Sequence, residues 1–452
     1  MKLATTIVET LRPFQAPLRS GFSTIILFVA GAGLTLSMEL ILARLLGVEQ
    51  FGRFISIYSL ITLLTVFSRL GFDTALLRFL PAYEVQGKLD LITGITWRSS
   101  QWVLAVSLAV GLVMAGLTAT FIDQQDPTFV FTAFLGCALL PLLSQAGVKQ
   151  ATLVGLGYPA VGLLPEKVLF PSLVIVGVFT LAVMTDLPKN STVAMSVAVF
   201  AAFLALLLST TVVHHRLAEK RRRNPRRYLN KEWITSALPF SLLNVAQLGL
   251  TKTDIIMLGF LRSPEESGKY AAASLLASLV VFFINSGNRV VSVEFSRSYA
   301  KKDHIKLQKL LTLSSSLFLL LSVPVILLLV VFGKTALGFY GPAFIEAYGI
   351  MLILIAGQSM ILVGGSVGFL LAMTSYHGLA SRVVIAASLL NIVLNALLIP
   401  SYGMLGAALS TAVSISFRSG ILGYFVWKKL NIMPSPAAPL LLKWVQSQSY
   451  KR

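Results

Sequence analysis

The chain has 452 residues, of which 56% are hydrophobic and 12% are charged, and its formal net charge is +19. Soluble domains carry about 25% charged residues, so this composition excludes an ordinary soluble protein and predicts an integral membrane protein. The bases are spread over the borders of apolar segments and form no aromatic-rich basic patch, which argues against nucleic-acid binding. Attraction to anionic membrane lipids is the expected consequence of the charge.

Apolar segments recur along the whole chain, and each is long enough to cross about 30 Å of hydrocarbon as a helix. A barrel strand would instead be about ten residues of alternating character. The sequence therefore predicts an all-α integral membrane protein with about twelve transmembrane helices. We predict these spans: 24–46, 54–80, 97–122, 129–155, 163–185, 192–216, 233–261, 268–299, 310–338, 343–374, 378–399 and 404–430.

A basic stretch at residues 214–231 divides the chain, with eight Lys or Arg and the single acid Glu219. Short loops rich in Lys and Arg stay on the cytoplasmic side. We therefore expect both termini and this stretch in the cytoplasm, in a multi-pass protein of the inner cell membrane. The predicted parts are an N-terminal six-helix lobe, a basic cytoplasmic linker, a C-terminal six-helix lobe and a cytoplasmic tail, at residues 1–213, 214–231, 232–430 and 431–452.

The two halves contain similar segments, which predicts an internal repeat. One offset of 216 positions pairs three residues of the second span with three of the eighth: Gly52 with Gly268, Phe79 with Phe295, and Tyr83 with Tyr299. Six spans in each half would make the repeats parallel, related by an axis along the membrane normal, as in one class of secondary transporter. Chance similarity between two apolar helices is the alternative.

Ionisable residues lie within several of the predicted spans, where charge is expensive and usually faces a cavity or a partner. Bases there could hold an anionic head group, and carboxylates could exchange H⁺ or Na⁺. The candidate substrate-binding residues are Arg69, Lys252 and Arg289, and the candidate ion-coupling residues are Glu39, Asp73 and Asp254. Arg69 and Asp73 are four residues apart, on one face of a straight helix, so a purely structural ion pair is the alternative for them.

Motifs of the common enzyme classes are missing from the sequence. There is no Walker A motif, so ATP hydrolysis is unsupported, and no zinc-protease or nucleophile-elbow motif occurs. Cys137 is the only cysteine, which excludes a cysteine-based metal site. We expect a protein that is not an enzyme and holds no cofactor or metal. A membrane-bound polysaccharide polymerase or ligase is the competing class.

Three segments, at residues 43–83, 252–279 and 394–414, carry a family resemblance. The second reads KTDIIMLGFLRSPEESGKYAAASLLASL and the third reads LNALLIPSYGMLGAALSTAVS. They resemble the polysaccharide-flippase branch, which includes O-antigen flippases, of the multidrug/oligosaccharidyl-lipid/polysaccharide exporter superfamily. Arg69, Asp73 and Asp254 fall on motif positions of that family.

The resemblance implies a two-lobed, V-shaped helical bundle with a central cavity that works by alternating access. It implies transport of an isoprenoid-diphosphate-linked oligosaccharide across the cell membrane for cell-surface polysaccharide biosynthesis. The expected partners are this lipid-linked oligosaccharide and membrane lipids; we expect a monomer, with polysaccharide-assembly proteins as further partners. An ion-coupled drug or cation antiporter of the same fold is the alternative, and a base-rich cavity argues against it.

Overall fold

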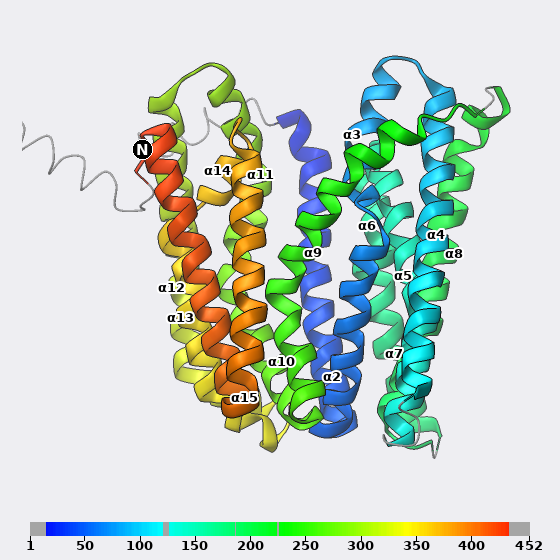
Figure 1. The fold of residues 1–452 in the computed structure, drawn as a ribbon, viewed down its shortest axis with the longest axis vertical. Helices are drawn as coiled ribbons and strands as arrows, with labels where there is room; N and C mark the ends of the chain where they lie inside the picture. Colours follow the sequence, from blue (N-terminus) through cyan, green and yellow to red (C-terminus); the bar gives the residue numbers. More distant parts are fainter. Residues whose placement is uncertain (1–14, 121–125, 186, 224–225, 434–452) are drawn as a thin grey trace, which may run out of the picture. The chain divides into compact units, whose positions relative to one another are not determined.

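The computed structural model describes residues 15–120, 126–185, 187–223 and 226–433. Within these ranges the side chains of residues 15–25, 219–223, 289, 290 and 293 are not described. Every regular element in the described ranges is a helix (Figure 1). The predicted cytoplasmic tail lies outside the described residues from position 434 onward.

The helices follow one another with short connections. In unbroken chain order they are α2 (Gln15–Ser68), α3 (Phe72–Val85), α4 (Leu89–Thr120), α5 (Pro127–Gly155), α6 (Pro159–Leu164), the π-helix η2 (Pro165–Leu169), α7 (Phe170–Met184), α8 (Ser191–Arg223), α9 (Asn230–Leu261), α10 (Pro264–Ser278), the 3₁₀ helix η3 (Leu279–Val281), α11 (Phe282–Ala300), α12 (His304–Gly338), the 3₁₀ helix η4 (Pro342–Ala347), α13 (Tyr348–Gly364), α14 (Val367–Ala372) and α15 (His377–Leu430).

Ten helical segments of the described chain are long and apolar enough to cross a membrane, which confirms the predicted all-α membrane class. The predicted count of twelve is not confirmed. The difference arises in the two longest segments, Ile26–Ser68 and His377–Leu430, each of which contains two predicted spans. Gly47 interrupts the first with φ 77°, and Gly403 interrupts the second with φ 53°, so each long helix consists of two straight pieces.

The chain forms two compact helical units. Unit 1 comprises residues 1–42 and 64–242, and unit 2 comprises residues 43–63 and 243–452. Figure 1 shows α4, α5 and α8 running side by side in unit 1, and α13 beside α15 in unit 2. The units differ from the predicted halves, because residues 43–63 belong to unit 2 and residues 214–242 belong to unit 1.

The basic stretch between the predicted lobes is attached to unit 1. Helix α8 continues to Arg223, and residues 224–225 lie outside the described chain. Beyond them the Arg227 amide donates to the Asp90 carbonyl at 3.3 Å, and the Trp233 indole donates to the Tyr83 hydroxyl at 3.0 Å. Burial raises the pKa of Tyr83. The stretch therefore ends in a buried anchor.

Helices α5, α10 and α12 each begin after a residue whose side chain caps the helix N-terminus. Asp126, Ser263 and Asp303 each accept a hydrogen bond from a backbone amide of the first turn of α5, α10 and α12. Pro127 and Pro264 follow two of these caps at the first helical position, where the missing N–H costs nothing. Side chains of this kind are the preferred helix N-caps.

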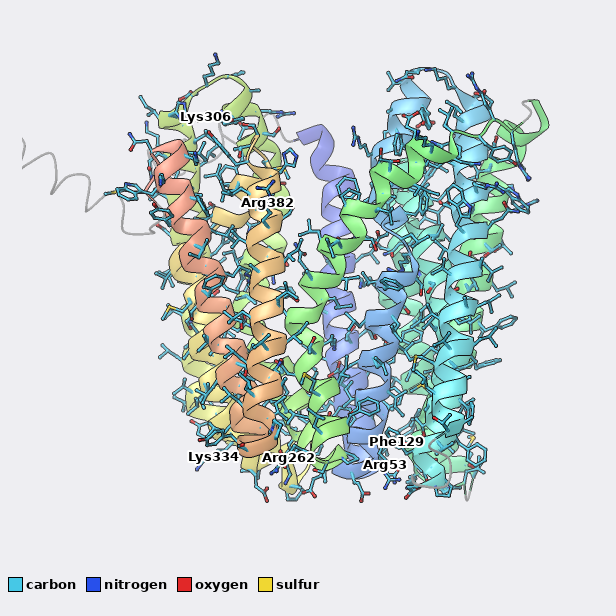
Figure 2. The ribbon with its side chains drawn as sticks, in the orientation of Figure 1. Arg53, Phe129, Arg262, Lys306, Lys334 and Arg382 are labelled. Carbon is cyan, nitrogen blue, oxygen red and sulfur yellow. The ribbon has the colours of Figure 1, made fainter. Side chains whose placement is uncertain are left out.

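Long apolar side chains cover the outer helix surfaces in both units (Figure 2). Leu112 of α4 is 73% exposed and Leu320 of α12 is 70% exposed, which suits contact with lipid. Small residues instead occupy many buried positions, such as Ala198 and Ala201 of α8. Small residues at helix contacts and large ones outside are typical of packing in a membrane, where lipid removes the hydrophobic drive between helices.

Candidate functional site

A buried carboxylate lies in unit 2. Asp254 of α9 is 2% exposed and accepts hydrogen bonds from side chains of two other helices. The Tyr270 hydroxyl of α10 donates to Oδ2 at 2.6 Å. The Thr411 hydroxyl donates to the same oxygen, and the Asn395 amide nitrogen donates to Oδ1, both from α15. The carboxylate is thus held by neutral donors alone.

A second layer of polar groups extends the Asp254 cluster. The Asn391 amide nitrogen donates to the Thr411 hydroxyl at 3.2 Å, and the Asn395 amide nitrogen donates to the Asn391 carbonyl oxygen at 3.1 Å. The Asn395 carbonyl oxygen is buried without a hydrogen-bond partner. Within the described ranges, no Lys or Arg forms an ion pair with Asp254. The site therefore has one carboxyl group and one orphaned acceptor, without a basic partner among the described residues.

The break in α15 brings the Asp254 ligands together, because Asn391 and Asn395 precede Gly403 and Thr411 follows it. Gly403 has φ 53° and ψ −132°, a conformation that favours glycine. A Cβ there would also collide with the Glu266 carboxylate.

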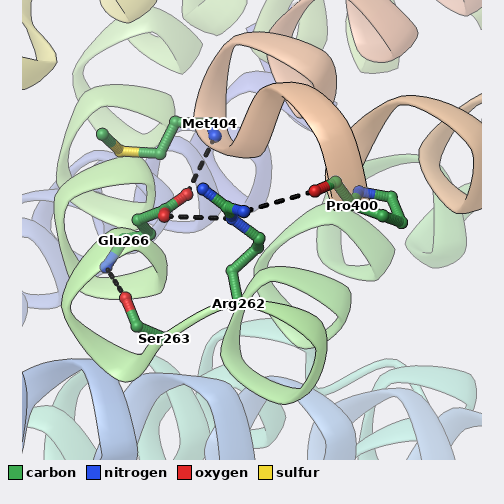
Figure 3. A network of polar contacts seen from close by, with 5 residues as sticks. All are labelled: Arg262, Ser263, Glu266, Pro400 and Met404. Carbon is green, nitrogen blue, oxygen red and sulfur yellow. Dashed lines mark hydrogen bonds and ion pairs between the residues drawn. The ribbon is translucent and has the colours of Figure 1, made fainter.

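Figure 3 shows how two side chains of unit 2 stabilise this break. The Glu266 carboxylate accepts the Met404 amide at 3.2 Å, and the Arg262 guanidinium donates to the Pro400 carbonyl at 3.2 Å. Arg262 and Glu266 also pair with each other at 3.2 Å. These contacts satisfy backbone groups that the break removes from the helix ladder.

A second cluster lies in unit 1, where Arg69 occupies the break between α2 and α3. Leu70 and Gly71 have φ 52° and 78°, so the backbone turns out of the helix there. A Cβ on Gly71 would be 2.7 Å from the Ser241 amide, and glycine thus allows α9 to approach. Irregular backbone at membrane depth is tolerated only inside protein or along a cavity.

The Arg69 guanidinium lies against the backbone of α5. Its Nη2 donates to the Leu143 carbonyl at 3.0 Å, and a Cβ on Gly147 would overlap the guanidinium itself. The Nε atom is buried without a hydrogen-bond partner. Arg69 is therefore held in place by α5 while part of its donor edge stays open.

Glu166 and Lys167, in the π-helix η2, complete this cluster. The Lys167 ammonium pairs with Glu166 Oε1 at 2.8 Å, and Glu166 Oε2 is buried without a partner. Arg69 lies within electrostatic range of the Glu166 carboxylate. Gly31 lets α2 approach, since a Cβ there would be 2.9 Å from the Lys167 Cβ. Two bases and one acid leave one excess positive charge in a half-buried setting, as an anion site requires.

The remaining predicted site residues are Glu39, Asp73, Lys252 and Arg289, and the side chains of the first three are described. Glu39 is buried on α2 at 6% exposure. Asp73 accepts the Thr74 amide at 2.9 Å in the first turn of α3. Lys252 is half-buried on α9, two positions from Asp254. The side chain of Arg289 on α11 lies outside the described residues.

The prediction that Arg69 and Asp73 lie on one face of a straight helix is wrong. Arg69 precedes the break and Asp73 follows it, so the two residues are not one turn apart on a continuous helix. No ion pair joins them in the described structure, where the Arg69 donor reaches the Leu143 carbonyl instead. The turn at Leu70 and Gly71 is the physical reason.

Residues of the Asp254 cluster other than Asp254 itself were not predicted. Tyr270 and Thr411 are neutral and are separated from Asp254 by 16 and 157 positions, so only the fold brings them together. Asn391 and Asn395 carried a signal that could have been used. Two amides one turn apart in an apolar span need a polar partner.

The sequence of this chain matches a known protein family. The profile of the family described as "Polysaccharide biosynthesis protein" matches residues 18–159 and 167–293, more than half of the chain. The chain belongs to this family. The predicted resemblance to proteins of polysaccharide biosynthesis is thereby confirmed, and the protein is a membrane protein with a role in polysaccharide biosynthesis.

One curated relative is the "Probable low-salt glycan biosynthesis flippase Agl15" of Haloferax volcanii. It is 22% identical over 180 residues, which are 40% of this chain and 38% of that protein. The match thus spans less than half of the relative's length.

Solved structures of two kinds of transporter share the fold. The inward closed conformation of the lipid II flippase MurJ has a TM-score of 0.69 at 15% identity and covers 89% of this chain and 87% of that chain. The inward-facing conformation of a multidrug resistance MATE family transporter of the MOP superfamily has a TM-score of 0.68 at 14% identity, covering 90% and 94%. At these identities the likeness concerns the fold alone.

Proposed function

We propose that this protein is a flippase that moves an isoprenoid-diphosphate-linked oligosaccharide across the cell membrane by alternating access. Membership of the polysaccharide biosynthesis family supports a glycan substrate, and the printed names of Agl15 and MurJ are those of flippases. The observation that carries the proposal is the half-buried, positively charged Arg69 cluster of unit 1. An organic cation would be repelled by that charge, whereas a diphosphate would be attracted.

Arg69 suits a phosphate for reasons of geometry as well as charge. A guanidinium binds phosphate oxygens through parallel N–H donors, and the Nε of Arg69 has no hydrogen-bond partner. Lys167 supplies a second cation from η2. Lys252 and Arg289 of the C-terminal half remain proposed substrate-binding residues.

A binding measurement on purified protein tests the substrate class. The ligands are an isoprenoid-diphosphate oligosaccharide, the corresponding monophosphate and a lipophilic organic cation. We expect the diphosphate to bind most tightly, and Arg69→Ala to weaken it by at least tenfold, since a charged hydrogen bond contributes about 1.5–3 kcal/mol. Preference for the cation would instead support the antiporter function.

The Asp254 cluster is the proposed site of the coupling ion, H⁺ or Na⁺. Hard cations prefer oxygen ligands. Asp254, Thr411 and the carbonyl oxygens of Asn391 and Asn395 offer carboxylate, hydroxyl and amide oxygens, from four residues of one hydrogen-bonded cluster. The orphaned Asn395 oxygen would gain a partner when a cation binds. Among described residues no group of three or more His, Cys, Asp or Glu could hold a metal ion, so a transition-metal site has no support.

Proteoliposomes with an imposed Na⁺ or H⁺ gradient separate the two ions. We expect transport by the wild type to respond to one of the gradients, and Asp254→Asn to lose that response while still binding the diphosphate lipid. Asp73→Asn serves as the comparison variant, because Asp73 lies in unit 1 and outside the Asp254 cluster. An Asp254→Asn variant that follows the gradient like the wild type would eliminate this site.

A further inference from the structure

The Arg69 cluster contains an acid that a simple anion site would not need. Glu166 is a carboxylate inside a membrane span, with one oxygen bound to Lys167 and the other buried without a partner. A buried acceptor without a partner costs free energy. A structural ion pair would be expected to use both oxygens, so this arrangement calls for another explanation.

The local backbone places the charges with unusual geometry. Adjacent residues of an α-helix do not face each other, yet Lys167 and Glu166 pair at 2.8 Å. They do so within the π-helix Pro165–Leu169, and short π-helices often occur at functional sites. Pro165 at its start has no N–H to donate.

Arg69 is positioned from the other side without using Glu166 fully. The guanidinium bonds to a main-chain carbonyl of α5, and its Nε is buried without a partner. An unpaired Nε and an unpaired Oε2 thus coexist on two groups that interact electrostatically. The Nε–H of Arg69 can donate a hydrogen bond to a phosphoryl oxygen. Oε2 of Glu166 is an acceptor, as phosphoryl oxygens are, so it gains no hydrogen bond from them.

We propose that Glu166 is the resident counter-ion of Arg69 and Lys167, and that it competes with the diphosphate of the substrate for these two bases. This inference rests on the proposed function. When the substrate is absent, Glu166 offsets the buried positive charge. When the diphosphate binds, Lys167 exchanges the carboxylate for phosphoryl oxygens, and the nearby negative charge then favours release. Glu166 is thus a positioning residue that limits affinity and maintains turnover.

The test uses inorganic pyrophosphate as the probe, bound to the purified full chain, together with transport of the diphosphate lipid. Glu166→Gln should bind pyrophosphate about tenfold more tightly, because removing one buried like charge near the ligand is worth about 1.4 kcal/mol. Its transport turnover should fall. Glu166→Asp shortens the side chain by one methylene and so moves the carboxylate away from the bases. It should raise pyrophosphate affinity and lower turnover by smaller amounts, and it replaces Glu166→Gln if that variant folds poorly.

Two controls make the outcomes distinct. Glu346→Gln removes an acid that pairs with Lys269 at 2.6 Å in unit 2, and it should leave pyrophosphate binding unchanged. If Arg69→Ala abolishes binding but Glu166→Gln binds like the wild type or more weakly, the counter-ion role is overturned and the proposed function stands. If Arg69→Ala binds pyrophosphate normally, the phosphate site of the proposed function fails. Tighter binding with unchanged turnover would also overturn the role in release.

Discussion

Gly52 of α2 and Gly268 of α10 pack backbone against backbone in unit 2. A Cβ on Gly268 would be 3.1 Å from both the Cα and the amide nitrogen of Gly52, and 2.7 Å from the Val48 carbonyl. The same two glycines are equivalent under the 216-position repeat of the sequence. Neither position therefore has room for a side chain while the two helices pack this closely.

The first prediction follows from that contact. Gly268→Ala or Gly52→Ala should destabilise the protein by about 1–3 kcal/mol, because a methyl group would be forced into a filled space. The melting temperature of the purified protein in detergent measures the effect. Gly33→Ala is the control, since no atom lies within 4 Å of its added Cβ. A Gly268→Ala variant that melts with the wild type would contradict the close packing.

Glu266 gives the second prediction, through the break in α15. Glu266→Ala leaves the Met404 amide and Arg262 without their carboxylate, which should cost about 1–3 kcal/mol. Amide hydrogen exchange should rise at residues 400–406. Glu49→Ala removes an exposed partner of Arg53 and should cost less than about 1 kcal/mol. Equal effects of the two variants would show that Glu266 does not stabilise the break.

The third prediction concerns pH. Glu294 lies in the last two turns of α11, which ends at Ala300, and Lys306 of α12 pairs with it. Mainly through this hydrogen bond, the pKa of Glu294 is lowered. A lowered folded-state pKa contributes stability above the unfolded value of about 4.3, and the contribution is lost as pH falls through the folded pKa.

The pH effect is measured as a difference in melting temperature. Lys306→Met should melt below the wild type at neutral pH, and the difference should disappear as the pH is lowered below about 4. Lys302→Met, at an exposed lysine outside this pair, should show no such pH-dependent difference. A Lys306→Met deficit that persists at acid pH would mean that packing, not charge, causes it.

The fourth prediction concerns orientation in the membrane. Figure 2 shows Lys306 near one end of unit 2, with Arg262 and Lys334 near the other. Loop charge places the Lys306 end in the cytoplasm. In a Cys137→Ser background, Tyr402→Cys should react with an impermeant thiol reagent in intact cells, whereas Lys88→Cys should react only after lysis; both positions are exposed. The opposite pattern would reverse the orientation.

Much of the fold could be predicted from the sequence because hydrocarbon thickness imposes span length. All ten observed segments overlap predicted spans. The breaks at Gly47 and Gly403 fall between predicted spans, although the helix continues on both sides of each glycine and each pair of spans forms one long segment. The turn at Leu70 and Gly71 was also missed, because apolar residues flank it on both sides.

The candidate sites were only partly predictable, for a different reason. A charge inside an apolar span is visible in the sequence, and Arg69 and Asp254 were found that way. Their partners are mostly neutral groups or main-chain atoms, such as Tyr270 and the Leu143 carbonyl. Contacts of this kind depend on tertiary packing and leave no mark in composition or spacing.

Transbilayer movement of the substrate is the most direct test of the proposed flippase activity. Purified protein is placed in liposomes that contain an isoprenoid-diphosphate oligosaccharide with a fluorescent glycan, and an impermeant quencher is added outside. With wild-type protein, quenching should progress beyond the outer-leaflet fraction seen in protein-free liposomes, and Arg69→Ala should slow it at least tenfold. Quenching that stops at the protein-free level with folded wild-type protein under an imposed Na⁺ or H⁺ gradient would contradict the account.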